Sequence, residues 1–255
     1  MSLQFTLSRT YSDAAVILRT QNLGETDRVI ILLTPQFGVV HAVAKGVRKG
    51  NSRFGGRLEP FMYVDVSFVA AKNLHTISQV QTRRAFTAPL MSNFDAYLVA
   101  LVLVELAEEL TKFTDDEVPE LFQLLVGGLS ALSRSVHHPL DIANSFVLRA
   151  MRDGGWDIGG SQCVQCGENN HLAWFSPELG LLCENCARAL SNTRVRPLSK
   201  ELVQYLGSAA LGDWAAIDSQ PHEEYAKHAV WLLSEFIQWH LEKPLKSLTM
   251  LEREI

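Results

Sequence analysis

The sequence predicts an α+β protein, with strands in its first part and helices in the rest. Three observations support this fold class. Short apolar runs separated by turn residues occupy the first ninety positions, a helical period begins near Asn93, and two Cys-x-x-Cys pairs interrupt the helical part. The 255 residues, 47% of them hydrophobic and 20% charged, suffice for two domains or for one domain with an insert.

Five strands are expected in residues 1–90. Each run is β-branched or alternates apolar with polar residues, and the breaks carry Gly, Pro or Asn. The expected strands are Ala14–Thr20, Arg28–Thr34, Gly38–Ala44, Phe61–Ala70 and Thr76–Ala85. Strands spaced this closely indicate a small antiparallel barrel or sandwich, and their number fits an OB-fold, a five-stranded barrel that binds oligonucleotides.

The segment between the third and fourth expected strands, Ala44–Phe61, concentrates positive charge and is called the basic loop below. Its only acid is Glu59, and its cations are Lys45, Arg48, Lys49, Arg53 and Arg57. Such a loop suits a negatively charged polymer, because cations neutralise phosphates and an aromatic such as Phe54 can stack on an unpaired base. A solvated surface loop is the alternative interpretation.

Charge is distributed unevenly along the chain. Residues 1–90 carry 11 Lys/Arg and 5 Asp/Glu, whereas residues 91–255 carry 12 and 23. The overall charge of −5 argues against a uniformly basic nucleic-acid binder, but the first segment alone is strongly positive. Arg83 and Arg84, at the end of the fifth expected strand, are secondary candidates for contacts with a polyanion. An exposed strand end is the simpler interpretation of this pair.

From Asn93 onwards, apolar residues recur at three- and four-residue steps. The expected helices are Phe94–Phe113, Pro119–Arg134, Pro139–Asp153 and His222–Leu241. We expect their apolar stripes to form a core, with a docking surface as the less favoured alternative.

Glu105, Glu108 and Glu109 fall on one side of the first helix. They could bind a metal, but no suitably spaced histidine accompanies them, and a solvated acidic face is expected.

The four cysteines form the most specific motif. Cys163 and Cys166 make one Cys-x-x-Cys pair, and Cys183 and Cys186 make a second one after sixteen intervening residues. This spacing predicts a zinc ribbon, because each pair supplies two thiolates from one tight turn; Gly167 would adopt the positive φ that such a turn needs. Four thiolates complete a tetrahedron, so we expect one structural Zn²⁺ rather than disulfides or free thiols.

No enzyme motif and no membrane segment are recognised. The longest apolar run, Ala96–Val104, is much shorter than the roughly 20 residues that span a bilayer, and the N-terminus lacks the pattern of a secretion signal. The sequence also lacks a phosphate-binding loop and a nucleophile–base pair. We therefore expect a cytoplasmic, nucleoid-associated protein with no catalytic residues.

Taken together, these features resemble the RecO family, bacterial recombination mediator proteins of DNA repair. The resemblance covers most of the chain and is carried by A-K-G-V-R-K…S-R…L-E-P-F in the basic loop, by Asp13-Ala-Ala-Val-Ile-Leu, by Gly24-Glu-Thr-Asp-Arg28 and by Pro244-Leu-Lys-Ser247. It implies binding to single- and double-stranded DNA and annealing of complementary strands. It also implies that the protein works with RecR to load the recombinase on single strands coated by single-strand binding protein. By position, the five loop cations would be the main DNA contacts.

The expected organisation has four segments. They are an OB-fold DNA-binding domain at residues 1–90, the first part of a helical domain at 91–160, a zinc ribbon insert at 161–190 and the second helical part at 191–255. Two other functions remain as alternatives. One is a protein–protein adaptor with an incidental basic loop, and the other is a zinc-dependent nucleic-acid-modifying enzyme, which would need a zinc with an open position.

Overall fold

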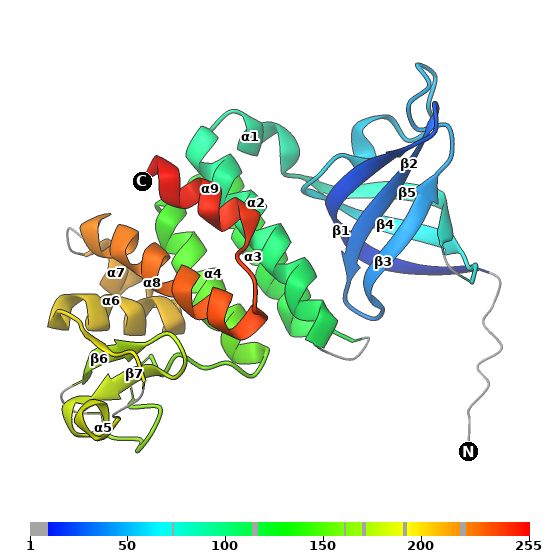
Figure 1. Ribbon diagram of the computed structural model, residues 1–255. Helices are drawn as coiled ribbons and strands as arrows, with labels where there is room; N and C mark the ends of the chain where they lie inside the picture. The colour runs from blue at the N-terminus through cyan, green and yellow to red at the C-terminus, as the bar shows by residue number, and fades with distance from the viewer. Residues whose placement is uncertain are drawn as a thin grey trace, which may run out of the picture.

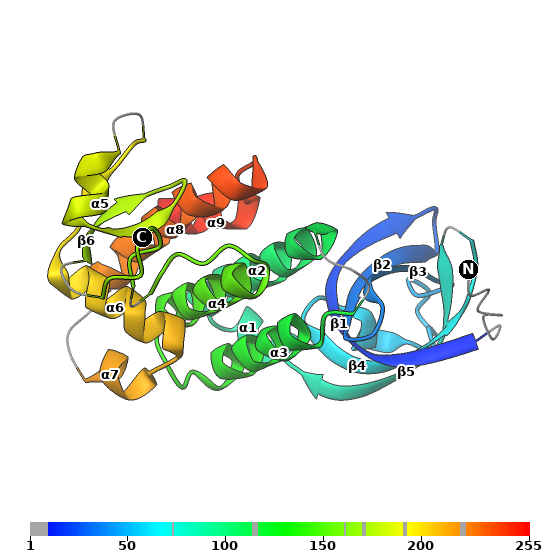
Figure 2. The ribbon, with the colours of Figure 1, turned by 90° about the horizontal axis from the view of Figure 1, so that it is seen from below.

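The structure is a computed structural model that describes residues 10–72, 74–113, 117–160, 162–169, 172–190, 193–219 and 223–255. A five-stranded barrel lies beside a helical body, and a small cysteine-containing hairpin lies on the far side of the helices (Figure 1). Seen from below, the barrel and this hairpin are at opposite ends of the molecule (Figure 2). The expected α+β class is confirmed.

The barrel is closed in the strand order β1-β2-β3-β5-β4. Neighbouring strands are antiparallel except β3 and β5, which pair in parallel over a short stretch. The strands are β1 (Thr10–Leu23), β2 (Asp27–Thr34), β3 (Gly38–Ala44), β4 (Met62–Val69) and β5 (His75–Ala85). This arrangement is that of an OB-fold. All five expected strands are present, and β1 extends further at both ends than the sequence indicated.

The β1–β2 hairpin is buried on both of its faces. One face lines the barrel interior through Ala15, Ile17, Ile30 and Leu32. The other face belongs to the core of the helical body through Val16, Leu18, Ile31 and Leu33. This double burial explains why both strands read as nearly continuous apolar runs. Strand β4 instead alternates buried and half-buried residues along its whole length.

The helical body surrounds α2 (Phe94–Leu110), which is buried on most of its circumference and continues into a short 3-10 turn, η2 (Thr111–Phe113). Around it lie α3 (Pro119–Arg134), α4 (Pro139–Asp153) and α9 (Lys246–Glu254), and α8 (Glu223–Leu241) packs on α4. The bounds of α3 and α4 are those expected. The expected start of α8, His222, lies outside the described residues.

Several shorter helices had no predicted counterpart. Helix α1 (Thr87–Met91) follows the barrel, and α6 (Lys200–Leu211) and α7 (Trp214–Asp218) precede α8. The cysteine-containing hairpin comprises β6 (Leu172–Ser176), β7 (Gly180–Cys183) and α5 (Glu184–Ala189), and β6 also pairs with the short β8 (Arg196–Pro197). Helix α6 packs on both α4 and α8, which places the hairpin next to the helical core.

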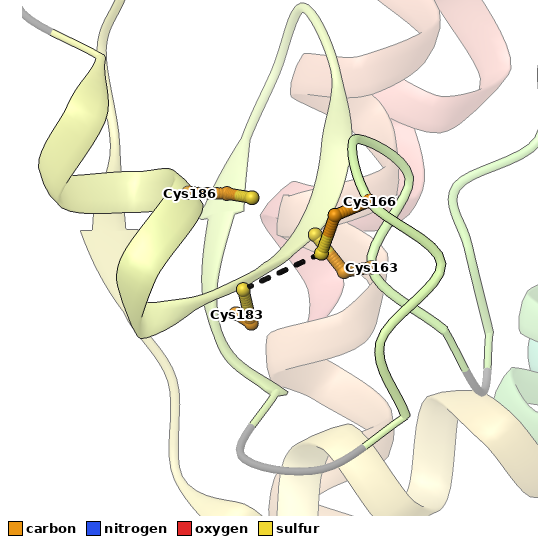
Figure 3. Close-up of side chains that lie close together, drawn as sticks. All are labelled: Cys163, Cys166, Cys183 and Cys186. Carbon is orange, nitrogen blue, oxygen red and sulfur yellow. Dashed lines mark hydrogen bonds between the residues drawn. The ribbon is translucent and has the colours of Figure 1, made fainter.

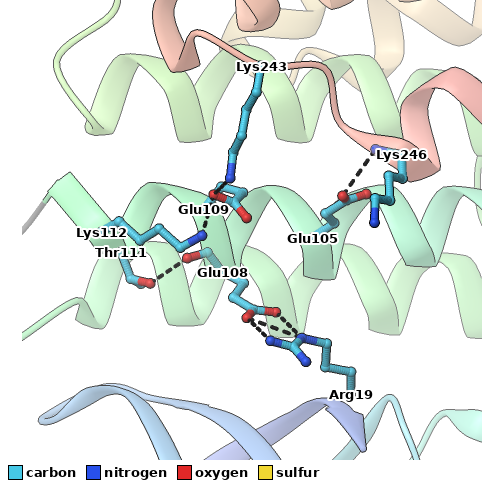
Figure 4. Close-up of polar contacts among 8 residues, drawn as sticks. All are labelled: Arg19, Glu105, Glu108, Glu109, Thr111, Lys112, Lys243 and Lys246. Atoms are coloured by element: carbon cyan, nitrogen blue, oxygen red, sulfur yellow. Dashed lines mark hydrogen bonds and ion pairs between the residues drawn. The ribbon is translucent and has the colours of Figure 1, made fainter. Parts of the chain in front are cut away.

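Glu108 joins the helical body to the barrel. Its carboxylate accepts hydrogen bonds from the Arg19 guanidinium of β1, the shortest from Nε at 2.8 Å and from Nη2 at 2.7 Å (Figure 4). The Glu108 side chain is only 14% exposed. The expectation of a solvated acidic face on α2 is therefore wrong for this residue, because the acid is covered by the neighbouring strand.

Glu105 and Glu109 hold the C-terminal segment against α2. Glu105 accepts hydrogen bonds from the backbone N–H groups of Lys246, at 3.1 Å, and Ser247, at 2.7 Å, at the start of α9. Glu109 forms ion pairs with Lys112 and Lys243 (Figure 4). Burial raises the pKa of Glu109, but the hydrogen bonds from both lysines outweigh it and lower the pKa. All three glutamates thus hold other parts of the chain to one helix.

Two adjacent glycines of α3 provide a test of this packing. A Cβ added at Gly128 would lie 2.7 Å from Cδ2 of the fully buried Leu103, whereas one at Gly127 would meet nothing within 4 Å. We expect Gly127→Ala to stabilise the protein by up to about 1 kcal/mol through helix propensity. We expect Gly128→Ala to destabilise it by about 1–3 kcal/mol through overpacking. Chemical denaturation of both variants would show this, and equal shifts in one direction would contradict it.

Candidate nucleic-acid interface and metal centre

The basic loop is anchored to the barrel by its own apolar residues. Phe54 is 2% exposed and Leu58, in the 3-10 turn η1 (Gly55–Leu58), is 1% exposed, and both belong to the barrel core. The expectation that Phe54 could stack on a base is therefore wrong, because its ring fills the barrel interior. The Arg53 guanidinium lies over this ring, 4.8 Å from its centre. The buried aromatic fixes the middle of the loop.

All five cations of the basic loop are exposed. Among the residues that the structure describes, none of the five takes part in an ion pair. Arg48 and Arg57 donate side-chain hydrogen bonds only to backbone carbonyl groups. By contrast, Arg19 and Arg28 of the same barrel are each paired with a glutamate. Within the described part of the chain, the cations of the loop are therefore left without ion-pair partners.

The turn between β1 and β2, together with Asp27 at the start of β2, lies against the start of the basic loop. The backbone N–H of Gly46 donates to Oδ1 of Asp27 at 2.8 Å, and the backbone N–H of Arg48 donates to the carbonyl of Thr26 at 3.0 Å. The bond from Gly46, and then that from the Thr26 hydroxyl, lower the pKa of Asp27. Asp27 was not among the residues predicted to matter, although the sequence contained a signal in the Gly24–Arg28 segment.

The structure separates the two arginines at the end of β5. Arg83 donates to Asp65 from Nε at 2.8 Å and to the Tyr63 hydroxyl from Nη1 at 2.9 Å. These two bonds raise the pKa of Arg83 above its ordinary value. Arg84 is exposed and forms no ion pair with any described residue. Only Arg84 therefore presents a positive charge without a counter-ion.

The four cysteines converge on one point. Cys163 and Cys166 come from the turn before β6, Cys183 ends β7 and Cys186 lies in α5 (Figure 3). Their sulfur atoms all lie within 4.8 Å of one another, and Cys166 Sγ is 3.8 Å from Cys183 Sγ. A tetrahedral zinc with Zn–S bonds of about 2.3 Å requires sulfur–sulfur distances of about 3.8 Å. All four cysteines are free, so this cluster can bind a metal ion.

The backbone around Cys163 favours the thiolate form of this residue. Gly167 has a φ of 75°, as expected, and its N–H donates to the Cys163 carbonyl at 2.8 Å. Burial raises the pKa of Cys163, but hydrogen bonds from backbone N–H groups, the first of them that of Cys183, outweigh it and lower the pKa to about 6. The contact with Cys166 raises the pKa of Cys186 to about 12. A bound dication would favour the thiolate form of all four.

The cysteine hairpin has little apolar core of its own. Its separate cluster of buried residues consists of Cys163, Leu182, Cys183 and Ala187. The opposite side of the hairpin is better covered, since Phe175 and Leu181 belong to the core of the helical body. Burial of so few residues gives little stability, and small modules of this kind usually depend on a metal or disulfides.

Comparison with known protein families agrees with this architecture. Residues 8–86 match the family model described as "Recombination protein O N terminal", and residues 91–249 match "Recombination protein O C terminal". The chain belongs to the RecO family. Curated relatives of the chain carry the name "DNA repair protein RecO", so the family is one of DNA repair proteins.

Three of these RecO relatives illustrate the extent of the similarity. One from a Nocardioides species is 40% identical over 248 residues, covering 95% of this chain and 99% of the relative. Those from Bifidobacterium longum and Thermobifida fusca are each 35% identical, covering 95% of this chain and 98% of the relative. Separately, none of the helices in the described ranges combines the length and hydropathy needed to cross a membrane.

Proposed function

We propose that this RecO-family protein is a DNA-binding recombination mediator. In this proposal it binds single- and double-stranded DNA, anneals complementary strands, and with RecR helps to load the recombinase on single strands coated by single-strand binding protein. It acts in the cytoplasm, where the nucleoid supplies its DNA. The observation that carries the proposal is a set of five exposed cations, none of them in an ion pair with a described residue, on an anchored loop of an OB-fold barrel in a family of DNA repair proteins.

The proposed contacts are made with phosphates. Lys45, Arg48, Lys49, Arg53 and Arg57 are the main contacts. Both aromatic residues of the loop, Phe54 and Phe61, are buried and cannot stack on bases. Binding should therefore depend little on the base sequence of the DNA. Annealing follows from the same charges, since cations that neutralise phosphates reduce the repulsion between two approaching strands. Arg84 is a secondary contact, and Arg83 ranks behind it because Asp65 already holds its guanidinium.

We further propose that residues 1–90 form the DNA-binding domain, that residues 91–160 and 191–255 form one helical domain, and that residues 161–190 are a zinc ribbon inserted into it. Cys163, Cys166, Cys183 and Cys186 would hold one Zn²⁺, and the sulfur–sulfur distances fit it. The ion would supply a cross-link between the two cysteine pairs. Four thiolate ligands leave no open position for a substrate, which disfavours a zinc-dependent nucleic-acid-modifying enzyme.

The loop contacts predict a salt-dependent affinity. The five loop contacts to a single strand should contribute about −3.5 to the slope of log affinity against log salt, and replacing Arg48, Lys49 and Arg53 with alanine should make the slope shallower by about 2.1. Fluorescence anisotropy with labelled oligonucleotides of different sequence would measure this, and all sequences should weaken alike. Alanine at Arg134, Lys200 and Arg253, exposed cations of the helical body, is the charge-matched control. An unchanged slope in the loop variant would contradict the proposed contacts.

The two arginines of β5 provide a second prediction. Arg84→Ala should make the salt slope shallower by about 0.7 and weaken binding about fivefold near 0.1 M salt, the contribution of one single-strand contact. Arg83→Ala should leave the slope unchanged, because Asp65 and Tyr63 already hold this side chain. The two substitutions remove the same charge from neighbouring positions, so each serves as the control for the other. A larger change of slope in Arg83→Ala would reverse this assignment.

The cysteine cluster predicts one zinc per chain. Cys163→Ser should abolish metal binding and expose residues 161–190 to proteolysis, while DNA affinity stays unchanged because the basic loop is at the opposite end of the molecule. Elemental analysis of the purified protein would measure the metal, and Gln165→Ala in the same turn is the control that keeps all four ligands. Wild-type protein without metal and with disulfide-bonded cysteines would refute the site.

A further inference from the structure

The Gly24–Arg28 segment contacts both ends of the basic loop. It comprises the turn residues 24–26 and the first two residues of β2, Asp27 and Arg28, and is called the β1–β2 turn below. It carries one cation and two acids and supplies none of the proposed DNA contacts. In the fold, however, it lies directly against the basic loop, which supplies the proposed DNA contacts. The contacts at the start and at the end of the loop involve different residues of the turn.

At the start of the loop, the turn supplies three hydrogen-bond acceptors. Oδ1 of Asp27 accepts from the backbone N–H of Gly46 at 2.8 Å. The carbonyl of Thr26 accepts from the backbone N–H of Arg48 at 3.0 Å, and the carbonyl of Gly24 accepts from Arg48 Nη1 at 3.1 Å. Gly24 and Gly46 have φ values of 61° and 68°, a left-handed conformation that favours glycine. The two segments thus meet through one bond between their backbones and two bonds that each involve a side chain.

At the end of the loop, the turn supplies a cation. Arg28 Nη1 lies 2.9 Å from Oε1 of Glu59, the only acid of the basic loop. The chain then returns to the barrel, where the N–H of Phe61 donates to the Ile17 carbonyl at 2.8 Å. Both ends of the loop are therefore held by the same hairpin, and the buried Phe54 holds its middle.

We propose that the β1–β2 turn, with Asp27 as its central residue, is a positioning element that holds the loop cations ready for phosphates. This inference rests on the proposed DNA-binding function and names residues that make no contact with DNA. A flexible loop loses conformational entropy when it is ordered by a ligand, and contacts formed in the free protein reduce that loss. The turn holds the backbone N–H of Gly46, next to Lys45, and that of Arg48 itself, so the backbone positions of both cations are set before DNA arrives.

Asp27 makes this proposal testable, because its charge and its contacts act in opposite directions. It is an acid close enough to Lys45 and Lys49 for both lysines to lower its pKa, so by charge alone it repels DNA and its removal should strengthen binding. If Asp27 positions the basic loop, its removal should instead weaken DNA binding. Glu25, two residues away, is exposed and forms no hydrogen bond or ion pair with any described residue.

The experiment compares Asp27→Ala with Glu25→Ala in the full-length protein. Each variant loses one negative charge from the same turn. We would measure affinity for a labelled oligothymidylate by anisotropy over a salt series. For Asp27→Ala, the affinity near 0.1 M salt should fall about fivefold for each phosphate contact that the loop loses, and the salt slope should become shallower. Glu25→Ala should bind at least as tightly as wild type. Asp27→Asn should recover part of the affinity, because its amide oxygen can still accept from Gly46.

Hydrogen exchange provides a readout that needs no DNA. The amides of Gly46 and Arg48 should exchange faster in Asp27→Ala and not in Glu25→Ala. If Asp27→Ala does not fold, Asp27→Asn is compared with Glu25→Gln, and a smaller loss of affinity is expected because asparagine keeps one acceptor oxygen for Gly46. Binding by the Asp27 variant as tight as that of its Glu25 counterpart would overturn the positioning role while leaving the loop contacts intact. Unchanged binding in the loop-cation variant would instead refute the proposed function itself.

Discussion

The double burial of the β1–β2 hairpin determines how the rest of the molecule is arranged. One of its faces completes the barrel interior, and the other is part of the helical core, so the barrel and the helices share two strands. The Arg19–Glu108 ion pair lies at the edge of this shared surface, with the acid largely covered. The turn of the same hairpin touches the basic loop. One supersecondary unit therefore links the core, the interface between the two parts and the proposed DNA-binding loop.

The charges of the chain are used in two different ways. In the helical body, the glutamates of α2 are paired with cations or cap a helix, and they hold distant segments together. In the basic loop, five cations are exposed and none of them forms an ion pair with a described residue. Paired surface charges contribute little field at a distance, whereas unpaired ones attract a polyanion and depend on salt. Although the net charge of the chain is −5, the barrel therefore carries exposed positive charge in its basic loop.

The sequence predicted features that depend on local patterns and missed those that depend on distant partners. Strand β3 and helices α3 and α4 were placed at their observed bounds, because alternation, helical period, proline and glycine are local signals. Glu108 meets a partner 89 positions away and Glu105 one 142 positions away, which no local pattern shows. The same limit applied to Phe54, whose burial depends on how the loop folds back into the barrel. Arg83 differs from Arg84 only through the pairing of β5 with β4.

The cysteine hairpin shows how a local motif and distant packing can stabilise different sides of one module. The spacing of the four cysteines was sufficient to predict that their sulfur atoms meet. It could not show that Phe175 and Leu181 would anchor the inner side of the hairpin in the helical core, or that β6 would pair with β8. The inner side therefore depends on apolar burial and the outer side on the cysteines. Because the basic loop is anchored by a separate core cluster at the opposite end of the molecule, the hairpin and the loop are stabilised independently.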